Sequence, residues 1–495
     1  MKTTLILIAW IGLTFLVYGA VLPDFFLSDD FGFVSRLAED CPVSLWDCTK
    51  RFGGALFFRP LTSLSFYVDY LLWQQNSLGY HATNLICHGL NCYLVAALAT
   101  KLTGLQRLGA IAGLIFLVLP SHCEAVVWIS ARSDLFCTAL VLMGLLLHLY
   151  DRLWFACLCF GLALTAKESG IIYPLLLWQW RSRLNFRLVV AYGMILASYL
   201  MWRYAALGVI IGGYSTGIIW WQIPLNLWHS IGRTLFPPWG AVWIYPLSVM
   251  ILVIGFWRSR YLLSSAQLTC RQLVIAYLIC LLPVLNLSVS LTTSQEERFL
   301  YLPSAFACIL LAILIGGLST YLGIYLKISL GVLILSLGLG LQSSIQVWRA
   351  AAQISDGMVQ SLALIPPAQV LYVVNLPDHL GGAYIFRNSL PRAVKLFQPG
   401  RFQQVKPLAF HPLHQVDHVF EITDHNRLAS SLVPMVFYFK QGGRLLYPGQ
   451  DQLITPDFEI TELSDRGFRF RLLQLQGQDQ VVYYSRGRLW PLPKS

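Results

Sequence analysis

Two adjacent carboxylates, Asp29 and Asp30, stand directly after the first long apolar run of the chain, within Leu27-Ser28-Asp29-Asp30-Phe31. One of them could act as a general base toward an acceptor hydroxyl, and the pair could instead help to hold a divalent metal ion. A structural use stands beside both, since Ser28 or Asp29 could cap a helix that begins at Phe31. On local sequence alone the helix cap is the commoner use, and the choice between base and metal ligand stays open.

A polar stripe lies on the apolar segment that starts near Gly79. His81, Asn84, His88 and Asn91 are spaced to share one face of a helix. Polar groups that enter a membrane must face protein or a water-filled cavity. His81 and His88 are two turns apart and lack an obvious third ligand, which disfavours a metal site. Hydrogen bonding between helices is the favoured interpretation, and His81 is kept as a candidate pocket residue.

Three later motifs each place a cation beside an acid, within 120–134, at Lys167-Glu168 and within 295–303. Each could be a structural ion pair. Together, their cations Arg132, Lys167 and Arg298 would form a site for an anionic headgroup, above all a phosphate. Because charges at membrane depth are costly, function is the default hypothesis for them. Further candidate pocket residues are Arg59, His122, Glu124, Glu168 and Glu297.

The elements that must position these residues are those of a membrane protein. Of the 495 residues, 56% are hydrophobic and only 12% are charged, whereas a soluble protein carries roughly twice that charged fraction. So much apolar surface exceeds what one globular core can bury, because core growth stalls at about 250–300 residues. The formal net charge of +11 comes from dispersed basic residues without a nucleic-acid motif, which disfavours nucleic acid as a partner.

Apolar segments suited to membrane helices recur along residues 1–348. A spanning helix needs about 20 mainly apolar residues, or somewhat fewer inside protein. We therefore predict an all-α polytopic membrane domain over 1–348, with about eleven transmembrane helices. The first segment could instead be a signal peptide, but an uncleaved helix is favoured because so many spans follow. The predicted spans are 4–22, 83–100, 107–120, 135–150, 153–166, 169–180, 187–207, 241–257, 272–289, 303–323 and 328–347.

Basic residues gather in one set of connections between these spans, and such loops mark the cytoplasmic side. The N-terminus is therefore predicted to be cytoplasmic. The long loop 23–82, the acidic and cationic motifs and the C-terminal part then lie on the extracytoplasmic face. The basic residues concerned are Arg181, Arg183, Arg187, Arg258, Arg260, Arg271, Lys101, Arg107, Arg152 and Lys327.

The C-terminal part has a different texture from about Ile365 onward. Short β-type runs alternate with Gly, Pro and Asp turns, as in 370–374, 435–439 and 468–472, and Gln441-Gly442-Gly443 is typical of a hairpin connection. We predict a soluble, β-rich (α+β) domain over 365–495.

Cysteine usage adds one open question. The 11 cysteines end at Cys308, and most lie in apolar runs, where cysteine behaves as a small hydrophobe. Cys41 and Cys48 flank a polar stretch and could form a disulfide in an extracytoplasmic loop or remain two thiols.

Taken in order, these motifs resemble those of the GT-C class of membrane glycosyltransferases related to protein O-mannosyltransferases. The likeness is greatest to the transmembrane, tetratricopeptide-repeat-containing O-mannosyltransferases and their bacterial relatives. It runs from Asp29 to about Ser304 and rests on SDD, FRPLTSLSFYVDY, GYHATNLICHGLN, PSHCEAVVWISARSDL, TAKES and EERFLYLPS. No repeat of about 34 residues follows the last span, and the β-rich tail stands there instead. This departure weakens the inference of a protein acceptor.

The resemblance implies an enzyme that moves a sugar from a polyprenyl-phosphate carrier, with inversion at the anomeric carbon, on the outer face of a bacterial inner (plasma) membrane. In that class an acid of the first outer loop is the catalytic base, which maps onto Asp29 or Asp30, with Asp29 preferred. The sugar, the prenyl length, the acceptor (protein, lipid or glycan) and any divalent metal at the Asp pair stay open. Its donor-phosphate ligands would be Arg132, Lys167, Arg298 and Tyr301.

Three other functions are alternatives to this one. A transporter or flippase needs polar groups near the bilayer midplane, often within two related halves, whereas here the charged motifs cluster at outer ends and no matching halves stand out. A ligase or polymerase for lipid-linked glycans would use similar substrates. A non-catalytic anchor for the tail would leave the Asp pair and the three cations without a shared purpose.

Overall fold

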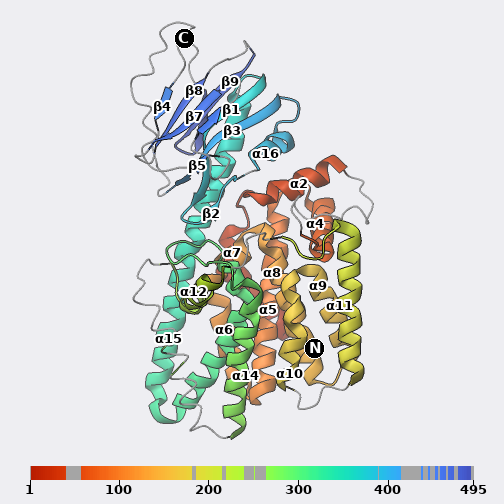
Figure 1. Ribbon diagram of the computed structural model, residues 1–495. Helices are drawn as coiled ribbons and strands as arrows, with labels where there is room; N and C mark the ends of the chain where they lie inside the picture. The colour runs from red at the N-terminus through yellow and green to blue at the C-terminus, as the bar shows by residue number, and fades with distance from the viewer. Residues whose placement is uncertain are drawn as a thin grey trace. The chain divides into compact units, whose positions relative to one another are not determined.

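The chain divides into two compact units in the computed structural model (Figure 1). The first, Met1–Pro23 with Pro42–Gln346, is helical, and the second, Asp24–Cys41 with Val347–Ser495, holds the β-strands. Some predictions concern residues outside those that the structure describes. They involve residues 41 and 48, most of the predicted span 241–257, the predicted hairpin at 441–443 and the arginines 181, 183, 258 and 260. The described residues are 2–40, 57–180, 186–213, 219–238, 250, 253, 264–387, 389–413, 436–438, 444–445, 452–454, 458–463, 467–472 and 478–491.

Apolar helices dominate the first unit. Among the described residues, six are long and apolar enough to cross a membrane, or up to seven if a bent pair counts as one span. The mostly helical architecture is thus confirmed, but a count of about eleven spans is not. The six are Thr3–Val21, Ser77–Thr103, Ile129–Leu149, Phe186–Leu207, Glu297–Gly316 and Lys327–Leu364, and the bent pair is Gln106–Val118 with Pro120–Val127.

Short elements account for much of the difference. Helix α10 (Tyr173–Trp180) has 8 residues, which extend only about 12 Å at the rise of an α-helix, against a hydrocarbon core of about 30 Å. Helix α9 (Leu153–Ala166) and the apolar stretch Thr269–Val284 are also shorter than a typical span. The last two predicted spans both lie within the run of helix α15 (Tyr301–Ser361) and are both among the six.

Helix α5 (Ser77–Thr103) is central to the first unit and packs against α1 (Lys2–Tyr18) and α6 (Gln106–Val118). It begins where the Asn76 side chain accepts the Leu78 N–H at 3.1 Å, an N-cap of the usual kind. On α6, a Cβ at Gly113 would lie 2.6 Å from the Trp10 ring. Glycine therefore lets α6 approach its neighbours closely, as small residues commonly do between membrane helices.

The helices around the candidate site meet at α9. This helix packs against α4 (Pro60–Trp73), α8 (Arg132–Leu149) and α11 (Phe186–Leu207). At its end, the Thr62 hydroxyl donates to the Ala166 carbonyl at 2.9 Å, and the 3-10 turn η4 (Glu168–Ile172) follows. Other elements of this unit are α7 (Cys123–Val127), η9 (Glu297–Leu300), α12 (Ile223–Leu235) and α14 (Ser264–Leu281).

The second unit contains two sheets (Figure 1). In the larger, β1 (Ala368–Leu380) lies between β3 (Phe402–Leu413) and β9 (Gln480–Ser485) and is parallel to both. Helix α16 (Leu390–Phe397) lies in the connection from β1 to β3, as parallel neighbours require a crossover. The sheet also includes β2 (Ala383–Tyr384), β5 (Arg444–Leu445) and β10 (Arg488–Pro491).

The smaller sheet is antiparallel, in the order β4-β8-β7-β6. Its β4 and β8, like β1 in the larger sheet, contain residues of the three runs predicted to be strands, so the β-rich texture of the C-terminal part is confirmed. The second unit also contains α2 (Asp29–Asp40), which packs against α16. The bounds in the smaller sheet are Val436–Tyr438, Gly467–Leu472, Phe458–Leu463 and Gln452–Ile454.

Candidate active site

A cavity of about 440 Å³ lies in the helical unit, bounded by residues of α9, η4 and α11 and by the segments around 57–59 and 283–287. Most of its wall is apolar or aromatic. Among the described residues, its charged lining residues are Arg59, Lys167, Glu168 and Arg203. Three of them, Arg59, Lys167 and Glu168, are residues predicted from the sequence, drawn from two motifs more than 100 positions apart.

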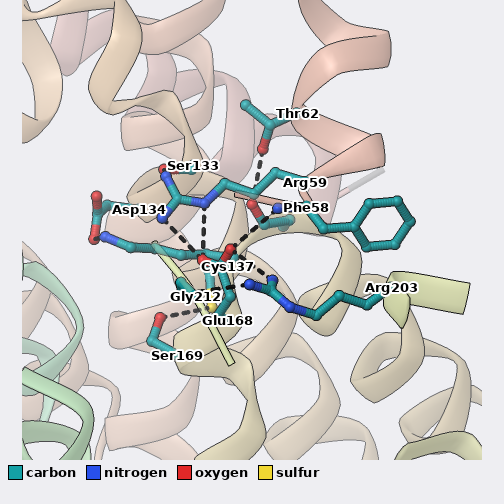
Figure 2. A network of polar contacts seen from close by, with 12 residues as sticks. Phe58, Arg59, Thr62, Ser133, Asp134, Cys137, Glu168, Ser169, Arg203 and Gly212 are labelled. Atoms are coloured by element: carbon teal, nitrogen blue, oxygen red, sulfur yellow. Dashed lines mark hydrogen bonds and ion pairs between the residues drawn. The ribbon is translucent and has the colours of Figure 1, made fainter. Parts of the chain in front are cut away.

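Glu168 lies between two arginines (Figure 2). Arg59 Nε and Nη2 are each 2.9 Å from Glu168 Oε2, and Arg203 Nη1 is 3.2 Å from Oε1. Both guanidinium groups are buried, whereas the Glu168 side chain is 29% exposed. Burial raises the pKa of this carboxyl, but the charges and hydrogen bonds of Arg59, together with the charge of Arg203, outweigh it and lower the pKa overall. Glu168 is therefore ionised at neutral pH.

The local sequence explains how Arg59 reaches this position. It is the residue before Pro60, the first residue of α4, and a residue before proline avoids helical geometry. Its backbone is accordingly non-helical, with φ −132° and ψ 62°. Arg59 Nη1 also donates to Ser133 Oγ at 3.3 Å, and its guanidinium lies 4.3 Å from the centre of the Phe57 ring. The arginine is thus tied to α8 as well as to η4.

Lys167 follows the last residue of α9, where the chain leaves helical geometry at φ −158° and ψ 145°. Its Nζ is 2.5 Å from Asp134 Oδ1 on α8 and 5.1 Å from the centre of the Phe299 ring. Counted over the described side chains, the three cations and the two carboxylates that pair with them carry one net positive charge beside the cavity. Such an arrangement suits a bound anion.

Arg203 is a charged cavity residue that the sequence analysis missed. It lies on α11, with Nε donating to the Ile210 carbonyl at 2.9 Å and Nη2 to the Gly212 carbonyl at 3.4 Å. It occurs within the predicted span 187–207, which contains few charges. A charged residue inside an apolar span is a functional candidate by default, so this signal was available in the sequence.

Arg132 lies away from the cavity lining, fully buried at the start of α8. Its Nη1 is 2.6 Å from Asp69 Oδ2, Nε donates to Asn84 Oδ1 at 2.9 Å, and Nη2 donates to the Tyr80 carbonyl at 2.9 Å. The structure therefore places this predicted phosphate ligand among protein acceptors.

Arg298 pairs with Glu124, which also accepts its backbone N–H at 2.9 Å. Its guanidinium lies 4.7 Å from the centre of the Phe299 ring, the aromatic side chain that also approaches Lys167. Phe299 lines the cavity and Arg298 does not, so Arg298 contacts the cavity lining through the Phe299 ring. The neighbouring Glu297 is fully buried and pairs with Arg233 of α12, a partner not predicted from the sequence.

Tyr301 and His122 belong to a buried polar cluster. The Tyr301 hydroxyl lies 2.6 Å from His88 Nδ1, and His122 Nε2 lies 2.7 Å from Ser304 Oγ. The predicted interhelical role of the stripe on α5 is present here, since His88 contacts a residue of α15. His81 is buried on the same helix. The predicted phosphate ligand Tyr301 and the predicted pocket residues His122 and His81 are not among the residues that line the cavity.

Asp29 and Asp30 belong to the second unit and differ from each other. Helix α2 begins at Asp29, two residues earlier than predicted. Asp30 is buried, and its Oδ2 accepts the Leu27 N–H at 3.0 Å, whereas Asp29 is exposed. Asp30 thus stabilises the turn that enters the helix. In the described part of the chain, no group of three His, Cys, Asp or Glu side chains is placed to hold a metal ion.

Comparison with known proteins gives related sequences and one informative fold. Over 297 residues the chain is 28% identical to Protein O-mannosyl-transferase F38B6.6 of Caenorhabditis elegans, covering 53% of this chain and 43% of that protein. Over 127 residues it is 37% identical to Protein O-mannosyl-transferase Tmtc1 of Drosophila melanogaster, covering 24% and 15% of the two chains. No protein-family model matches it.

The solved structure of ArnT from Cupriavidus metallidurans in the apo state superposes with a TM-score of 0.50 at 14% identity, over 80% of this chain and 85% of ArnT. At this identity the likeness concerns the fold. The chain spans less than half the length of the two curated relatives described above. It is an integral membrane protein related to the protein O-mannosyl-transferases, with the fold of a GT-C membrane glycosyltransferase, as its motifs predicted.

Proposed function

We propose that this protein is a membrane glycosyltransferase that moves a sugar from a polyprenyl-phosphate carrier to an acceptor hydroxyl, with inversion at the anomeric carbon. The observation that carries the proposal is the cavity beside which Arg59, Lys167 and Arg203 meet with one net positive charge. The relatives named protein O-mannosyl-transferases and the GT-C fold support the same class of reaction.

The cavity combines the two properties that a lipid-linked donor needs. Its arginines and lysine offer hydrogen-bond donors to phosphate oxygens, and Arg suits bidentate binding of such groups. Leu164, Leu200 and Ile211 are among the apolar side chains of the wall, and they suit the first isoprene units of the carrier. We propose this division of the cavity between a phosphate end and an apolar end.

During transfer, the bond between the anomeric carbon and the carrier phosphate breaks, and a bond from the acceptor oxygen to that carbon forms. The leaving phosphate gains negative charge as the bond breaks. Cations already fixed in place stabilise that charge without reorganisation at the moment of reaction. Arg59 and Arg203 are fixed in this sense by Glu168, and Lys167 is fixed by Asp134.

The acceptor hydroxyl must lose its proton as the new bond forms, and a carboxylate can take it. We propose Asp29 for this role, because it is exposed while Asp30 is buried against the Leu27 N–H. Transfer in the presence of a chelator tests whether a divalent metal ion assists this acid. The donor-phosphate role predicted for Arg132, Arg298 and Tyr301 has less support, since each is engaged by protein groups outside the cavity lining.

The topology proposal follows from the basic loops. The N-terminus is cytoplasmic, and Asp29, the cavity motifs and the β-rich unit are extracytoplasmic, in a bacterial inner membrane. This orientation gives the enzyme a donor that has already crossed the bilayer, so no nucleotide sugar is required at the site.

The test uses the purified full chain in lipid nanodiscs with defined polyprenyl-phosphate sugars, beginning with mannose because of the names of the relatives. We expect transfer in the wild type and its loss in Asp29→Asn. The matched control is Asp30→Asn, which should lower the stability of the protein but leave the folded protein able to transfer sugar. A parallel arm with chelator tests the metal. Movement of the lipid across proteoliposome membranes without glycosidic cleavage would instead identify a flippase, and turnover by Asp29→Asn at the wild-type rate would remove the base assignment.

A further inference from the structure

The segment that carries the Asp pair is part of the β-rich unit. Residues Asp24–Cys41 cluster with Val347–Ser495, although they are separated from them by more than 300 positions in the sequence. The contacts that unite them involve α2, the turn before it, and the chain from β2 into α16. They indicate a role for the C-terminal domain that its sequence alone does not reveal.

Aromatic packing is the first of these contacts. The Phe31 ring of α2 stacks on Phe386, with centroids 5.5 Å apart and an interplanar angle of 17°. Phe26 and Phe397 pack around the same ring, with centroids 6.2 Å and 6.3 Å from it. Phe26, Phe31 and Phe386 are fully buried. Burial of aromatic side chains supplies large apolar area and a defined geometry, so this cluster fixes the start of α2.

A backbone contact lies immediately before Asp29. Ser28 has φ +47°, a left-handed conformation that costs energy for a non-glycine residue. Its N–H donates to the Ile385 carbonyl at 2.7 Å, and the Ile385 N–H is in turn held by the Asp378 carbonyl at 2.8 Å. A strained residue persists only where its surroundings hold it, and here residue 385 of the β-rich unit does so.

Two further contacts hold the same segment. The Ser355 hydroxyl donates to the Phe26 carbonyl at 2.8 Å. At Gly32 an added Cβ would lie 2.5 Å from Nη1 of Arg392, so the end of this long side chain of α16 lies directly against α2. The segment is therefore held on both sides of the Asp pair.

We infer that the β-rich unit is the scaffold that sets the conformation of the acid-bearing segment, through the stack of Phe31 on Phe386 and the bond from Ser28 to Ile385. Phe386 and Ile385 are positioning residues, since they act on the carboxylate of Asp29 only through the backbone that holds it. The catalytic part of this inference rests on the proposed function, in which Asp29 is the base.

The experiment compares the full-length wild type with Phe386→Ala, Phe386→Leu and the control Leu489→Ala, which truncates another buried side chain of the same unit, on β10. Hydrogen exchange of the amides of residues 27–31 is measured without any ligand. We expect Phe386→Ala to lose about tenfold or more of its protection there, Phe386→Leu to recover most of it, and Leu489→Ala to keep it. Equal exchange in the wild type and Phe386→Ala, or equal loss in the control, overturns the scaffold.

Transfer from a polyprenyl-phosphate sugar is measured on the same preparations. A misplaced base lowers kcat, by about a hundredfold for a displacement of 1 Å, while the donor KM stays unchanged, and Phe386→Leu restores the rate. Altered exchange with unchanged kcat contradicts the positioning role. If the wild type transfers no sugar from any such donor, the proposed function fails, whereas the exchange result still decides whether the scaffold exists.

Discussion

Two arginine–carboxylate groups of the helical unit use the same residue types in different surroundings. Arg132 with Asp69 is a buried pair, and the Arg132 side chain is 0% exposed. Glu168 with Arg59 and Arg203 lines a cavity of about 440 Å³, and the Glu168 side chain is 29% exposed. The first group has protein acceptors on three sides, from Asp69, Asn84 and Tyr80. The second leaves one face toward a space that a ligand could fill.

This difference separates structural from functional charge. A buried pair whose donors are all used by protein holds helices together, and removing one partner leaves an uncompensated charge. A pair on a cavity wall can exchange a protein partner for a ligand oxygen. We therefore propose that pairs of the first kind stabilise the unit and that the pair at the cavity takes part in the chemistry, and the following changes test this proposal.

The largest expected effect is on folding, from Arg132→Ala. Loss of this guanidinium leaves Asp69 buried without its cation, at a cost of about 3–5 kcal/mol, so we expect little folded protein. Thermal unfolding in detergent and the yield of monodisperse protein measure it. A double variant, Arg132→Met with Asp69→Leu, should recover much of the loss. An Arg132→Ala protein that unfolds like the wild type but binds no donor would reverse the assignment.

The next effect is on turnover, from Arg203→Ala. The protein should fold, because Glu168 keeps Arg59 as a partner. Loss of one donor that stabilises the leaving phosphate typically costs about a hundredfold to a thousandfold in rate. Initial rates of transfer from a polyprenyl-phosphate sugar measure it, with Arg203→Lys as the charge-preserving control. An undiminished rate in Arg203→Ala would exclude a role for this cation.

Glu168→Gln should have a smaller effect, on binding. The substitution removes one negative charge beside the cavity while the side chain keeps its size, so an anionic lipid should bind about tenfold more tightly at low salt. Titration with polyprenyl phosphate at two ionic strengths measures the change, and Ser169→Ala, at the neighbouring lining position, is the matched control. Weaker binding would show that Glu168 acts chiefly by holding the arginines in place.

A third pair, Asp24 with Arg349 in the second unit, is intermediate, since the Arg349 side chain is 35% exposed. Burial raises the pKa of Asp24 to about 6, although the charge of Arg349 lowers it in part. The folded state therefore favours the protonated acid. Its contribution to stability is present below the ordinary carboxyl pKa of 3.8 and is lost as the pH rises through about 6.

Asp24→Asn should flatten this pH dependence. We expect the difference in unfolding free energy between the two proteins to change by about 2 kcal/mol from pH 4 to pH 7, because one pKa unit corresponds to about 1.4 kcal/mol and the pKa of Asp24 rises from 3.8 to about 6. Thermal unfolding at several pH values measures it. Identical pH profiles would mean that Asp24 titrates as an ordinary carboxyl.

The sequence predicted the kind of protein and part of the site because those features are local. The composition of apolar runs predicts helices. Lys167-Glu168 could be recognised as a candidate because this charged pair interrupts such a run at the end of α9. The predicted span at α10 is not confirmed, because this helix has 8 residues and an apolar segment can be buried in protein as well as in lipid. The β-type runs after Ile365 were recognisable from their turns.

The features of the site and fold that the sequence did not predict depend on contacts between residues far apart in the chain. Arg132 and Lys167 look alike in the sequence, and only packing decides that one meets Asp69 and the other lines a cavity. Arg203 joins Glu168 from another helix. The membership of Asp24–Cys41 in the β-rich unit depends on Phe386 and Ile385, which no local pattern connects to Asp29.

The decisive measurement for a glycosyltransferase of this kind is the stoichiometry of transfer by the purified wild type. Glycosylated acceptor and free polyprenyl phosphate are quantified together from one defined polyprenyl-phosphate sugar at a time. We predict that the two products appear in equal amounts with at least one such donor, and that the new glycosidic bond has inverted configuration. Binding of these lipids without cleavage of any of them, across the donors and acceptors tried, would contradict it.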